Sequence, residues 1–397
     1  MSRTITFIRH GETMANVETR WQGQLDAELS PTGLDQVARL GKRVAGRDVS
    51  RLISSDLGRT MNTAAVLGDP IPDSRWREFD VGRWEGLTSE EVQEQFPGEL
   101  EALIAGEDVS LGGGEHLSVF RERITDAFWD LADSMDDGDE ATVVTHGGVI
   151  WGIASDVLGF GGNAPMIPAH NTSFTHITID SSNRRQLSVF NDSTHLDSVP
   201  TQFGPEGKLV TVIRHGQTEG NLVHRWQGRS DSPLTANGQD QVASAAEHLP
   251  PLDVLYTSPL GRTMHTSQIL TEGIDLDPVP HDGLVEMAFG AWEDLTFEES
   301  AAQDPELFEQ VYRREIDLPR GRTGESFAEA GERIASAIAR LVASSNGDRL
   351  GAVSHGAAIR AYVTGIAGLG FAERNVFALP RNSSMSSVVY SDQTPVL

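Results

Sequence analysis

The chain has 397 residues and a formal net charge of −27. Its length suits two domains of about 150–200 residues, each large enough to bury its own hydrophobic core. So acidic a chain is not expected to bind nucleic acid or anionic membranes, which favour broad basic surfaces, and its lack of cysteine excludes disulfides and thiolate metal sites.

Residues 1–7 lead straight into an expected strand, without the apolar stretch of a signal peptide. No segment approaches the roughly 20 consecutive apolar residues that span a bilayer. We therefore expect a cytoplasmic protein without a membrane partner, and the sequence supports no prediction of its oligomeric state.

The first half alternates predicted strands with predicted helices. Strands are expected at 4–9, 51–54, 141–145, 172–180 and 187–191, and a long helix at 115–135. An earlier helix starts at Ser30-Pro31, with Ser30 as the N-cap and proline in the first helical position. Two of the strands run into histidine, at Arg9-His10-Gly11 and at His146-Gly147.

The second half repeats this pattern. Arg214-His215-Gly216 and Asn221 match Arg9-His10-Gly11 and Asn16, and Arg-Trp-Gln-Gly follows at the same spacing in both halves. Strands are expected at 209–214, 253–258 and 350–354, and the long helix at 325–345. We interpret the chain as a tandem duplication with domains at 1–195 and 206–397 and a linker at 192–208.

This alternation predicts an α/β fold in each half, with a mostly parallel central sheet between two layers of helices. Ligands bind such sheets outside the carboxyl ends of the strands. Because His10 and His146 both follow strand ends, we expect them to face one crevice. By the same argument, His215 and His355 should face a second.

The first crevice should hold two guanidiniums and two imidazoles. Arg9, His10, Asn16, Arg59 and His146 make a poor metal site, because cations repel a cation and no His-x-His or His-Glu-x-x-His spacing is present. Arginine forks match the oxygens of a phosphoryl group, and a helix start at Arg59 would add free N–H groups. A neutral imidazole held there can attack phosphorus, with no metal ion or other cofactor.

A leaving alkoxide also needs a proton. Glu78 is the candidate donor in the first half and Glu286 in the second, and a partly apolar wall would have to keep this acid protonated. Glu12, Asp26 and Glu85 compete with Glu78 on sequence grounds. The tryptophans are interpreted as packing residues and are not assigned to the site.

These residues closely resemble the histidine phosphatase superfamily, in its phosphoglycerate mutase-like branch. The resemblance covers nearly the whole chain, once per half, and it rests in the first half on Arg9-His10-Gly11-Glu12-Thr13, Asn16, Gln22-Gly23, Ser54-Ser55-Asp56-Leu57-Gly58-Arg59, the Glu78 segment and His146-Gly147. It implies a phosphohistidine on His10, phosphoryl binding by Arg9, Arg59 and His146, and proton donation by Glu78. The corresponding set in the second half is Arg214, His215, Asn221, Arg262, Glu286 and His355. Two departures, Asp56 where the second half has Pro259 and Asp294 after Trp-Glu, remove no phosphate ligand.

Hydrolysis of a small phosphomonoester is favoured over a mutase reaction, because both halves are short and lack room for mutase-type lid insertions. A non-catalytic, phosphate-sensing role for one half stays open. The segments expected to cover the crevices differ in charge, since 84–120 has no Lys or Arg whereas its counterpart contains Arg313, Arg314, Arg320 and Arg322. If these segments are lids, the second site should prefer a substrate with an additional anionic group; if they are solvated helix faces, no such preference is expected.

Overall fold

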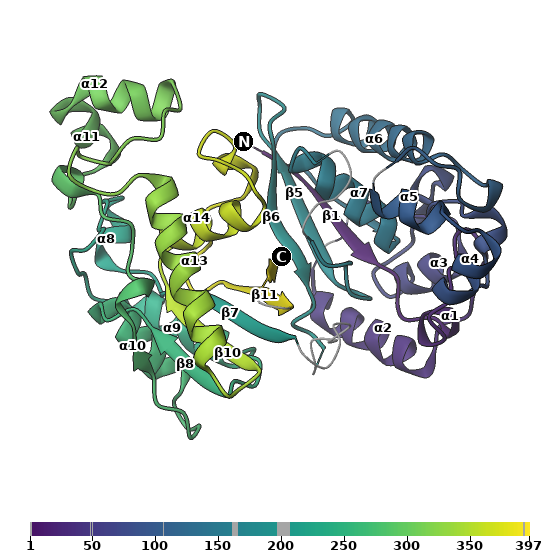
Figure 1. The fold of residues 1–397 in the computed structure, drawn as a ribbon, viewed down its shortest axis with the longest axis horizontal. Helices are drawn as coiled ribbons and strands as arrows, with labels where there is room; N and C mark the ends of the chain where they lie inside the picture. The colour runs from purple at the N-terminus through teal and green to yellow at the C-terminus, as the bar shows by residue number, and fades with distance from the viewer. Residues whose placement is uncertain are drawn as a thin grey trace. The chain divides into compact units, whose positions relative to one another are not determined.

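The computed structural model of the chain describes residues 2–47, 49, 51–105, 107–160, 166–196, 207–391 and 394–397. The chain divides into two compact units, Met1–Pro200 and Thr201–Leu397, and we describe each by itself (Figure 1). The linker predicted at 192–208 falls mainly on 197–206, which lie outside the described residues. No helix among the described residues is long and apolar enough to cross a membrane.

Each unit alternates strands and helices. The first contains β1 (Arg3–Arg9), α1 (Met14–Val17), α2 (Pro31–Val44), β2 (Leu52–Ser54), α3 (Gly58–Ala64), β3 (Ile71–Pro72), α4 (Ser89–Gln95), α5 (Glu99–Ala105), α6 (Leu117–Asp133), β4 (Glu140–Thr145), α7 (Gly147–Val157), β5 (Phe174–Ile179) and β6 (Arg185–Asp192). The second contains β7 (Lys208–Arg214), α8 (Glu219–Leu222), α9 (Ala236–Ala246), β8 (Val254–Thr257), α10 (Gly261–Leu270), β9 (Val279–Pro280), α11 (Phe297–Gln303), α12 (Pro305–Phe308), α13 (Phe327–Ser344), β10 (Arg349–Ser354), α14 (Gly356–Ile366), β11 (Met385–Ser391) and β12 (Thr394–Val396).

Both units are built on a six-stranded sheet with the same topology. The order is β3-β2-β4-β1-β5-β6 in the first and β9-β8-β10-β7-β11-β12 in the second. The first four strands of each order are parallel, and the last two pair antiparallel. The mostly parallel α/β architecture predicted for each half is confirmed, and the predicted strands and long helices end within two residues of the observed ones.

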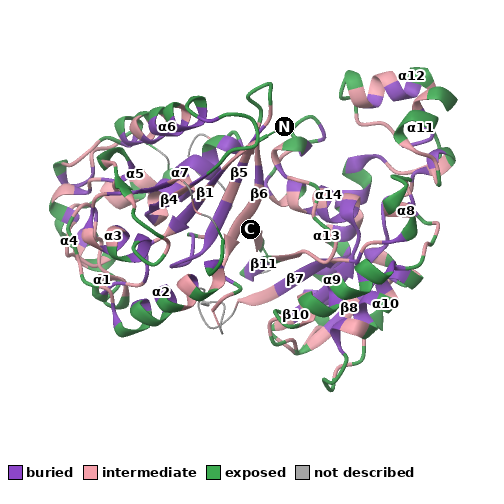
Figure 2. Ribbon diagram, turned by 180° about the vertical axis from the view of Figure 1, so that it is seen from behind, coloured by how far each residue is buried: buried purple, intermediate pink, exposed green. Residues whose placement is uncertain are grey.

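Neighbouring residues of β1 face opposite layers of helices, because side chains alternate along a strand. Phe7 packs against Trp76 and against Phe128 of α6, with ring centroids 5.6 and 6.4 Å away. Ile8 lies in a separate core cluster with Leu40 of α2. The central strands β1 and β4 are accordingly largely buried between helices whose outer faces are exposed (Figure 2).

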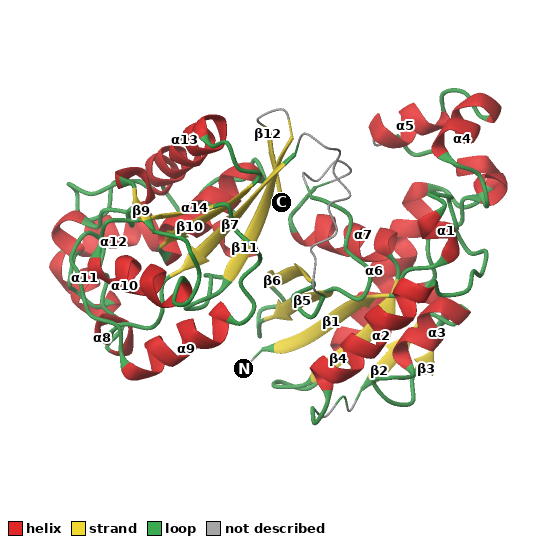
Figure 3. Ribbon diagram, turned by 90° about the horizontal axis from the view of Figure 1, so that it is seen from below, coloured by secondary structure: helices red, strands yellow, loops and turns green. Residues whose placement is uncertain are grey.

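The second unit has the same three layers. On one face of its sheet, Val212 of β7 packs with Ile338 of α13 and Tyr362 of α14. On the other, Ile213 packs with Val242 of α9. Figure 3 shows this sheet between α13 and α14 on one side and α9 on the other. Both faces are therefore covered, and the open places for a ligand are the sheet's edges and strand ends.

The helix after the first loop begins where the sequence predicts. The Ser30 hydroxyl accepts a hydrogen bond from the N–H of Gly33 at 2.9 Å, and Pro31 is the first residue of α2. Thr235 caps α9 through the N–H of Gly238 at 2.8 Å. These two caps fix the end of the loop that carries the Trp-Gln-Gly sequence in each unit.

Candidate active site

Each unit brings two histidines together at the carboxyl ends of its two central strands. Arg9 of β1 pairs with Thr145 of β4 in parallel register, so the residues that follow, His10 and His146, lie side by side. Their rings are 5.3 Å apart and inclined by 62°. In the second unit the rings of His215 and His355 are 5.2 Å apart and inclined by 64°. All four side chains are buried.

A backbone carbonyl fixes the tautomer of the first histidine in each pair. The Nδ1 atom of His10 lies 2.8 Å from the carbonyl oxygen of Gly11, and that of His215 lies 2.7 Å from Gly216. Since a carbonyl only accepts, Nδ1 must carry the hydrogen and donate it. The lone pair is thereby placed on Nε2, which is the form of imidazole that can act as a nucleophile.

The surroundings keep these histidines uncharged at neutral pH. Burial, followed by the positive charges of Arg59 and Arg9, holds the pKa of His10 well below its usual value of 6.5. Burial and the charges of Arg214 and Arg262 do the same to the pKa of His215. The pKa values of His146 and His355 are lowered in the same direction, again mainly by burial.

The two arginines of the first site are held by backbone carbonyls. Arg59 is 1% exposed and donates to Gly23 and Leu25, each at 2.8 Å, and Arg9 donates to the carbonyl of Ala169 at 2.6 Å. Among the described residues, the buried Nε–H groups of Arg9 and Arg59 have no acceptor. A buried guanidinium with an unused donor can bind an anion, although the matching Nε–H in the second unit, that of Arg262, donates to His355 instead.

Glycine is required where Gly23 presents its carbonyl to Arg59. Its φ is +51°, and a Cβ at this position would lie 2.7 Å from a carboxylate oxygen of Glu85. Gly228 repeats both features in the second unit, with φ of +54° and a Cβ position 2.6 Å from Glu293. The glycine of the Trp-Gln-Gly sequence therefore serves to position the guanidinium.

One expectation about Arg59 is wrong. The N–H groups at the start of α3 are not free for a phosphoryl group, because the Asp26 carboxylate accepts from Gly58 at 2.8 Å and from Arg59 at 3.3 Å. Asp231 occupies the start of α10 in the same way, through Gly261 and Arg262. A side-chain carboxylate already caps each helix, so the arginine side chain and not the helix end is left for an anion.

Glu78 lies at the start of the helix that follows His146. Its carboxylate accepts from the N–H of Phe79 and from that of Gly148, both at 3.0 Å. Its charge opposes the effect of burial, which lowers the pKa of both Arg9 and Arg59. The candidate proton donor therefore lies close to the arginines, and its short-range neighbours include two polar N–H groups, whereas a partly apolar wall was expected.

The matching acid in the second unit is held more tightly. Glu286 is 9% exposed and accepts from Met287 and Ala358 at 2.8 Å and from Ala357 at 3.2 Å. Ala357 stands where the first unit has Gly148, at which a Cβ would lie 2.3 Å from Glu78. The two carboxylates therefore sit on the helix start in slightly different ways.

The acids that compete with Glu78 are engaged elsewhere. Asp26 caps α3, and Glu12 accepts from the Ser30 hydroxyl at 2.6 Å. Glu85 accepts from the N–H groups of Gln24 and Leu25, at 2.7 and 2.9 Å. Each of the three stabilises a loop or helix start, and the charge of Glu78 acts on Arg9 and Arg59 more strongly than theirs, so Glu78 stays the predicted acid.

Asn16 is drawn into local structure more than expected. Its side-chain oxygen accepts from the N–H of Thr13 at 3.1 Å, as part of a capping box at the start of α1. Asn221 repeats this contact with Thr218 at 3.1 Å. Only the amide NH2 of each side chain is left to donate to a ligand, and their assignment to phosphate binding stays a prediction.

Two pairs of site residues were missed from the sequence. The Nε2 atoms of His146 and His355 lie 2.9 Å from the hydroxyls of Ser55 and Ser258. Asn171 donates to the carbonyl of His10 at 2.8 Å, and Asn382 to that of His215 at 3.1 Å. Each residue recurs at the equivalent position of the other unit, so a comparison of the two halves could have identified both pairs. Neither asparagine lies in a recognisable motif.

The two sites differ at the second histidine. The Nε–H of Arg262 donates to Nδ1 of His355 at 3.2 Å, which places the hydrogen of this neutral ring on Nε2, facing Ser258. In the first unit the corresponding atoms, Nε of Arg59 and Nδ1 of His146, each lack a partner among the described residues. The described ranges also contain no group of three His, Asp or Glu side chains arranged to hold a metal ion.

Comparison with known proteins places this geometry in a family. The sequence profile of the histidine phosphatase superfamily, branch 1, matches residues 5–193 and again 210–397. Among curated proteins, "Probable phosphoglycerate mutase GpmB" of Serratia proteamaculans is 34% identical over 193 residues, which cover 47% of this chain and 87% of that protein. The protein of the same name from Salmonella choleraesuis is 33% identical over 161 residues, covering 39% of this chain and 74% of that protein.

Solved structures align with one half of the chain. A mycobacterial glucosyl-3-phosphoglycerate phosphatase in complex with VO3 is 30% identical, with a TM-score of 0.43 over 48% of this chain and 98% of that one. A phosphoserine phosphatase from Entamoeba histolytica is 28% identical, with a TM-score of 0.43 over 48% of this chain and 94% of that one. The family profile matches nearly the whole chain, once in each unit. The chain therefore belongs to the histidine phosphatase superfamily, branch 1.

Proposed function

We propose that the chain is a phosphomonoesterase that hydrolyses small phosphorylated metabolites at two sites, through phosphohistidine on His10 and on His215. The observation that carries this proposal is the neutral His10 ring, whose Nδ1–H is tied to Gly11 and whose Nε2 is left as the nucleophile beside buried guanidiniums. Such a site can bind a phosphoryl dianion and attack it without a change of protonation.

The first step transfers the phosphoryl group to the protein. Nε2 of His10 attacks phosphorus, the bond from phosphorus to the ester oxygen breaks, and the leaving oxygen takes a proton from Glu78. Arg9 and Arg59 stabilise the charge on the equatorial oxygens. The products are the free alcohol and a phosphoramidate, which keeps Nδ1–H on the Gly11 carbonyl.

The second step returns the histidine to its starting state. Water attacks phosphorus, Glu78 takes a proton from it, and the bond between phosphorus and Nε2 breaks to release inorganic phosphate. The second site follows the same steps, with His215 as the nucleophile, Glu286 as the acid and Arg214 and Arg262 as the phosphoryl ligands.

Mutase-type phosphoryl transfer is the main alternative, because the curated relatives are named probable phosphoglycerate mutases. The chemistry differs only in the acceptor, which is water in a phosphatase and a bound monophosphate in a mutase. A phosphate-sensing role for one unit is a weaker alternative, because both units hold the same ring geometry and the same tautomer.

Single variants His10→Ala and His215→Ala separate the two sites and test the proposal. With a chromogenic aryl phosphate, each single variant should retain the turnover of the other site, and the double variant should lose it. His248→Ala, which removes an exposed histidine, is the matched control and should leave turnover unchanged. Rapid-quench labelling should place an acid-labile, base-stable phosphoryl group on the intact nucleophile.

Three results would decide between the alternatives. Release of inorganic phosphate from phosphoglycerates supports hydrolysis, and their interconversion with added bisphosphoglycerate supports a mutase. Vanadate binding without any turnover in one single variant identifies a sensing unit. Label on serine, or full activity of the double variant, would contradict the phosphohistidine mechanism.

A further inference from the structure

The second unit contains a cluster of three buried or half-buried arginines that the proposed chemistry does not use. Arg360 lies on α14, Arg374 in a short helical turn after it, and Arg320 in the segment between α12 and α13. We refer to these three residues as the arginine cluster. Arginines are seldom buried unless each charge has a partner, so such a cluster needs an explanation.

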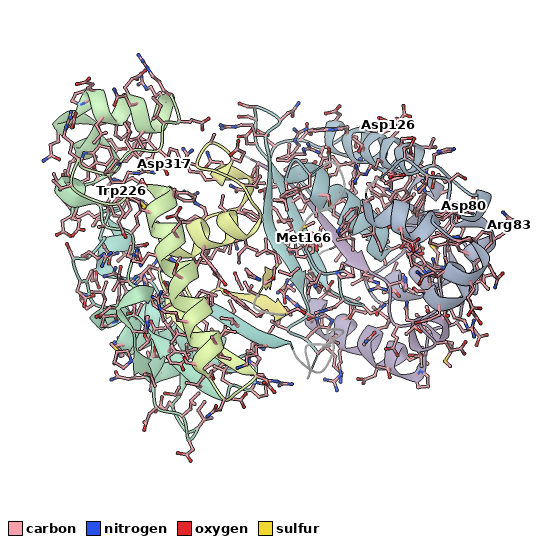
Figure 4. The ribbon with its side chains drawn as sticks, viewed as in Figure 1. Asp80, Arg83, Asp126, Met166, Trp226 and Asp317 are labelled. Atoms are coloured by element: carbon pink, nitrogen blue, oxygen red, sulfur yellow. The ribbon has the colours of Figure 1, made fainter. Side chains whose placement is uncertain are left out.

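Aromatic rings pack around the cluster. The guanidinium carbon of Arg320, a residue only 1% exposed, lies 4.5 Å from the ring centre of Phe371, and that of Arg374 lies 3.7 Å from the same ring. The ring of Tyr312 stacks with that of Trp226 at 6.1 Å. Trp226 is labelled in Figure 4, and in the described part of the chain its buried ring N–H has no acceptor.

The carboxylates nearby do not neutralise the cluster. Arg320 pairs with Asp317 at 3.1 Å, but Asp317 also accepts from the N–H groups of Phe327 and Ala328 at the start of α13. Arg374 pairs with Glu315 at 3.5 Å. The three guanidiniums therefore have two carboxylates near them, and each carboxylate pairs with a single guanidinium.

Arg360 is the unpaired member. Within the ranges that the structure describes, no carboxylate lies within ion-pair distance of it, and the buried Nε–H groups of Arg360 and Arg320 have no acceptor. Burial, helped by the charge of Arg374, lowers the pKa of Arg360 to about 10, which still leaves it charged at neutral pH. A half-buried cation without a carboxylate, whose buried Nε–H has no acceptor among the described residues, is an environment that an anion would complete.

The cluster adjoins the second catalytic site. Arg360 follows Ala357 and Ala358 within one turn of α14, and the N–H groups of these two alanines hold the Glu286 carboxylate. The charge of Glu286 raises the pKa of Arg360. Trp226 lies two residues before Gly228, and the carbonyl of Gly228 accepts a hydrogen bond from Arg262 at 2.8 Å. The cluster therefore shares a helix with the phosphoryl site, and Trp226, one of the aromatic residues near it, lies on the loop that holds Arg262.

The first unit lacks this feature at the corresponding positions. Trp151 follows His146 by the interval at which Arg360 follows His355, and the fully buried Leu111 precedes Gly112 as Arg320 precedes Gly321. Gly112 and Gly321 match because both have positive φ and pack on the equivalent backbone of their units. Apolar side chains thus stand at these two positions in the first unit, where the guanidinium of Arg121 lies 6.0 Å from the ring centre of Trp151.

Three of the four basic residues that were expected to give the second lid its charge form ion pairs at the surface, and Arg320 is the exception. Arg313 pairs with Glu309 at 3.2 Å, Arg314 lies 3.9 Å from the same carboxylate, and Arg322 pairs with Asp304 at 2.5 Å. Their side chains are 62–76% exposed, so solvent screens them. The charge that can distinguish the sites lies in the buried cluster.

We propose that the second site selects phosphomonoesters that carry a second anionic group, a carboxylate or a second phosphoryl, and that Arg360 and Arg320 bind this group. The inference rests on the proposed function, since it names the substrate class of one of its two sites. The first site, with Trp151 and Leu111 in their place, takes substrates without the second anion.

The test compares three substrates of one chain length, glycerol 3-phosphate, 3-phosphoglycerate and a propane bisphosphate, on the His10→Ala and His215→Ala variants. The His10→Ala variant, in which only the second site turns over, should show kcat/KM about 10- to 100-fold higher for one or both substrates with a second anionic group than for glycerol 3-phosphate. The His215→Ala variant should show no such preference. Which of these two substrates, 3-phosphoglycerate or the bisphosphate, shows the higher kcat/KM decides between a carboxylate and a phosphoryl group.

Arg360→Gln and Arg360→Lys, made in the His10→Ala background, then test the residue. Glutamine should raise KM for the preferred substrate about tenfold or more, while turnover of glycerol 3-phosphate changes little. Lysine keeps the charge but loses the Nε–H, and should give an intermediate KM. Arg313→Gln is the matched control, because that side chain is exposed.

Binding of a phosphonocarboxylate, measured by calorimetry against the alkyl phosphonate of equal length, gives a readout that needs no turnover. Tighter binding of the phosphonocarboxylate that Arg360→Gln abolishes would support the inference even if neither site hydrolyses esters, in which case only the proposed function fails. Equal substrate preference in the two single-site variants, or an equal loss on all substrates in Arg360→Gln, would overturn it.

Discussion

Replacing Glu78 with glutamine tests whether this carboxylate is the proton donor of the first site. The variant is made in the His215→Ala background, so that only the first site turns over. Its structural cost follows from the two N–H groups that Glu78 accepts, from Phe79 and Gly148 at 3.0 Å. Glutamine keeps one oxygen and turns the other into an NH2 group facing a donor, which should cost about 1–3 kcal/mol of local stability.

The chemical cost depends on the leaving group. An alkoxide needs its proton as the bond to phosphorus breaks, so kcat for an alkyl phosphate should fall about 10²- to 10⁴-fold. 4-Nitrophenolate is weakly basic and leaves without a proton, so kcat for its formation in the first turnover should fall less than about tenfold. The assay is pre-steady-state release of alcohol or nitrophenol, which separates this step from hydrolysis of the phosphohistidine.

Glu94→Gln, at an exposed position, controls for the loss of one negative charge. Circular dichroism and urea unfolding control for the structural cost. Equal losses of kcat for the alkyl and the nitrophenyl ester would refute the role of Glu78 as a proton donor, and would leave it the structural role of holding the start of α7.

Three further predictions follow from the same site. The pKa values of His10, His146, His215 and His355 are lowered on folding, so the unfolded chain binds more protons than the folded chain below about pH 6.5. The free energy of unfolding should therefore fall below this pH, by up to about 1.4 kcal/mol per pH unit for each histidine. Urea titrations in phosphate-free buffer between about pH 8 and 5 measure this, and a flat profile contradicts it. Ser55→Ala removes the hydroxyl 2.9 Å from His146 and should lower kcat of the first site about tenfold with folding intact, whereas unchanged kcat would show that the ring is positioned without it. Activity should survive chelators and be inhibited by vanadate, a mimic of the transferring phosphoryl group, and restoration of a chelated enzyme by a divalent ion would contradict the mechanism.

The sequence alone determined the alternation of strands and helices, the duplication, and the placement of one histidine after each central strand. These features follow from local rules, since apolar runs, a Ser-Pro helix start and the topology of parallel sheets act over short stretches or through a fixed geometry. His10 and His146 could therefore be placed in one crevice before their rings were seen 5.3 Å apart.

Only the tertiary structure decided which groups are satisfied and which are left free. The start of α3 looked open to an anion, but Asp26, which lies far from it in sequence, fills it. The sequence left open whether Arg313, Arg314 and Arg322 cover the second site or lie on a solvated face, and the structure shows them exposed and paired. Arg360 drew no attention in the sequence and is half-buried, with no carboxylate within ion-pair distance in the described part of the chain. The reason is physical, because burial and partners belong to contacts between distant segments, and these set the free energy of a charge far more than its neighbours along the chain do.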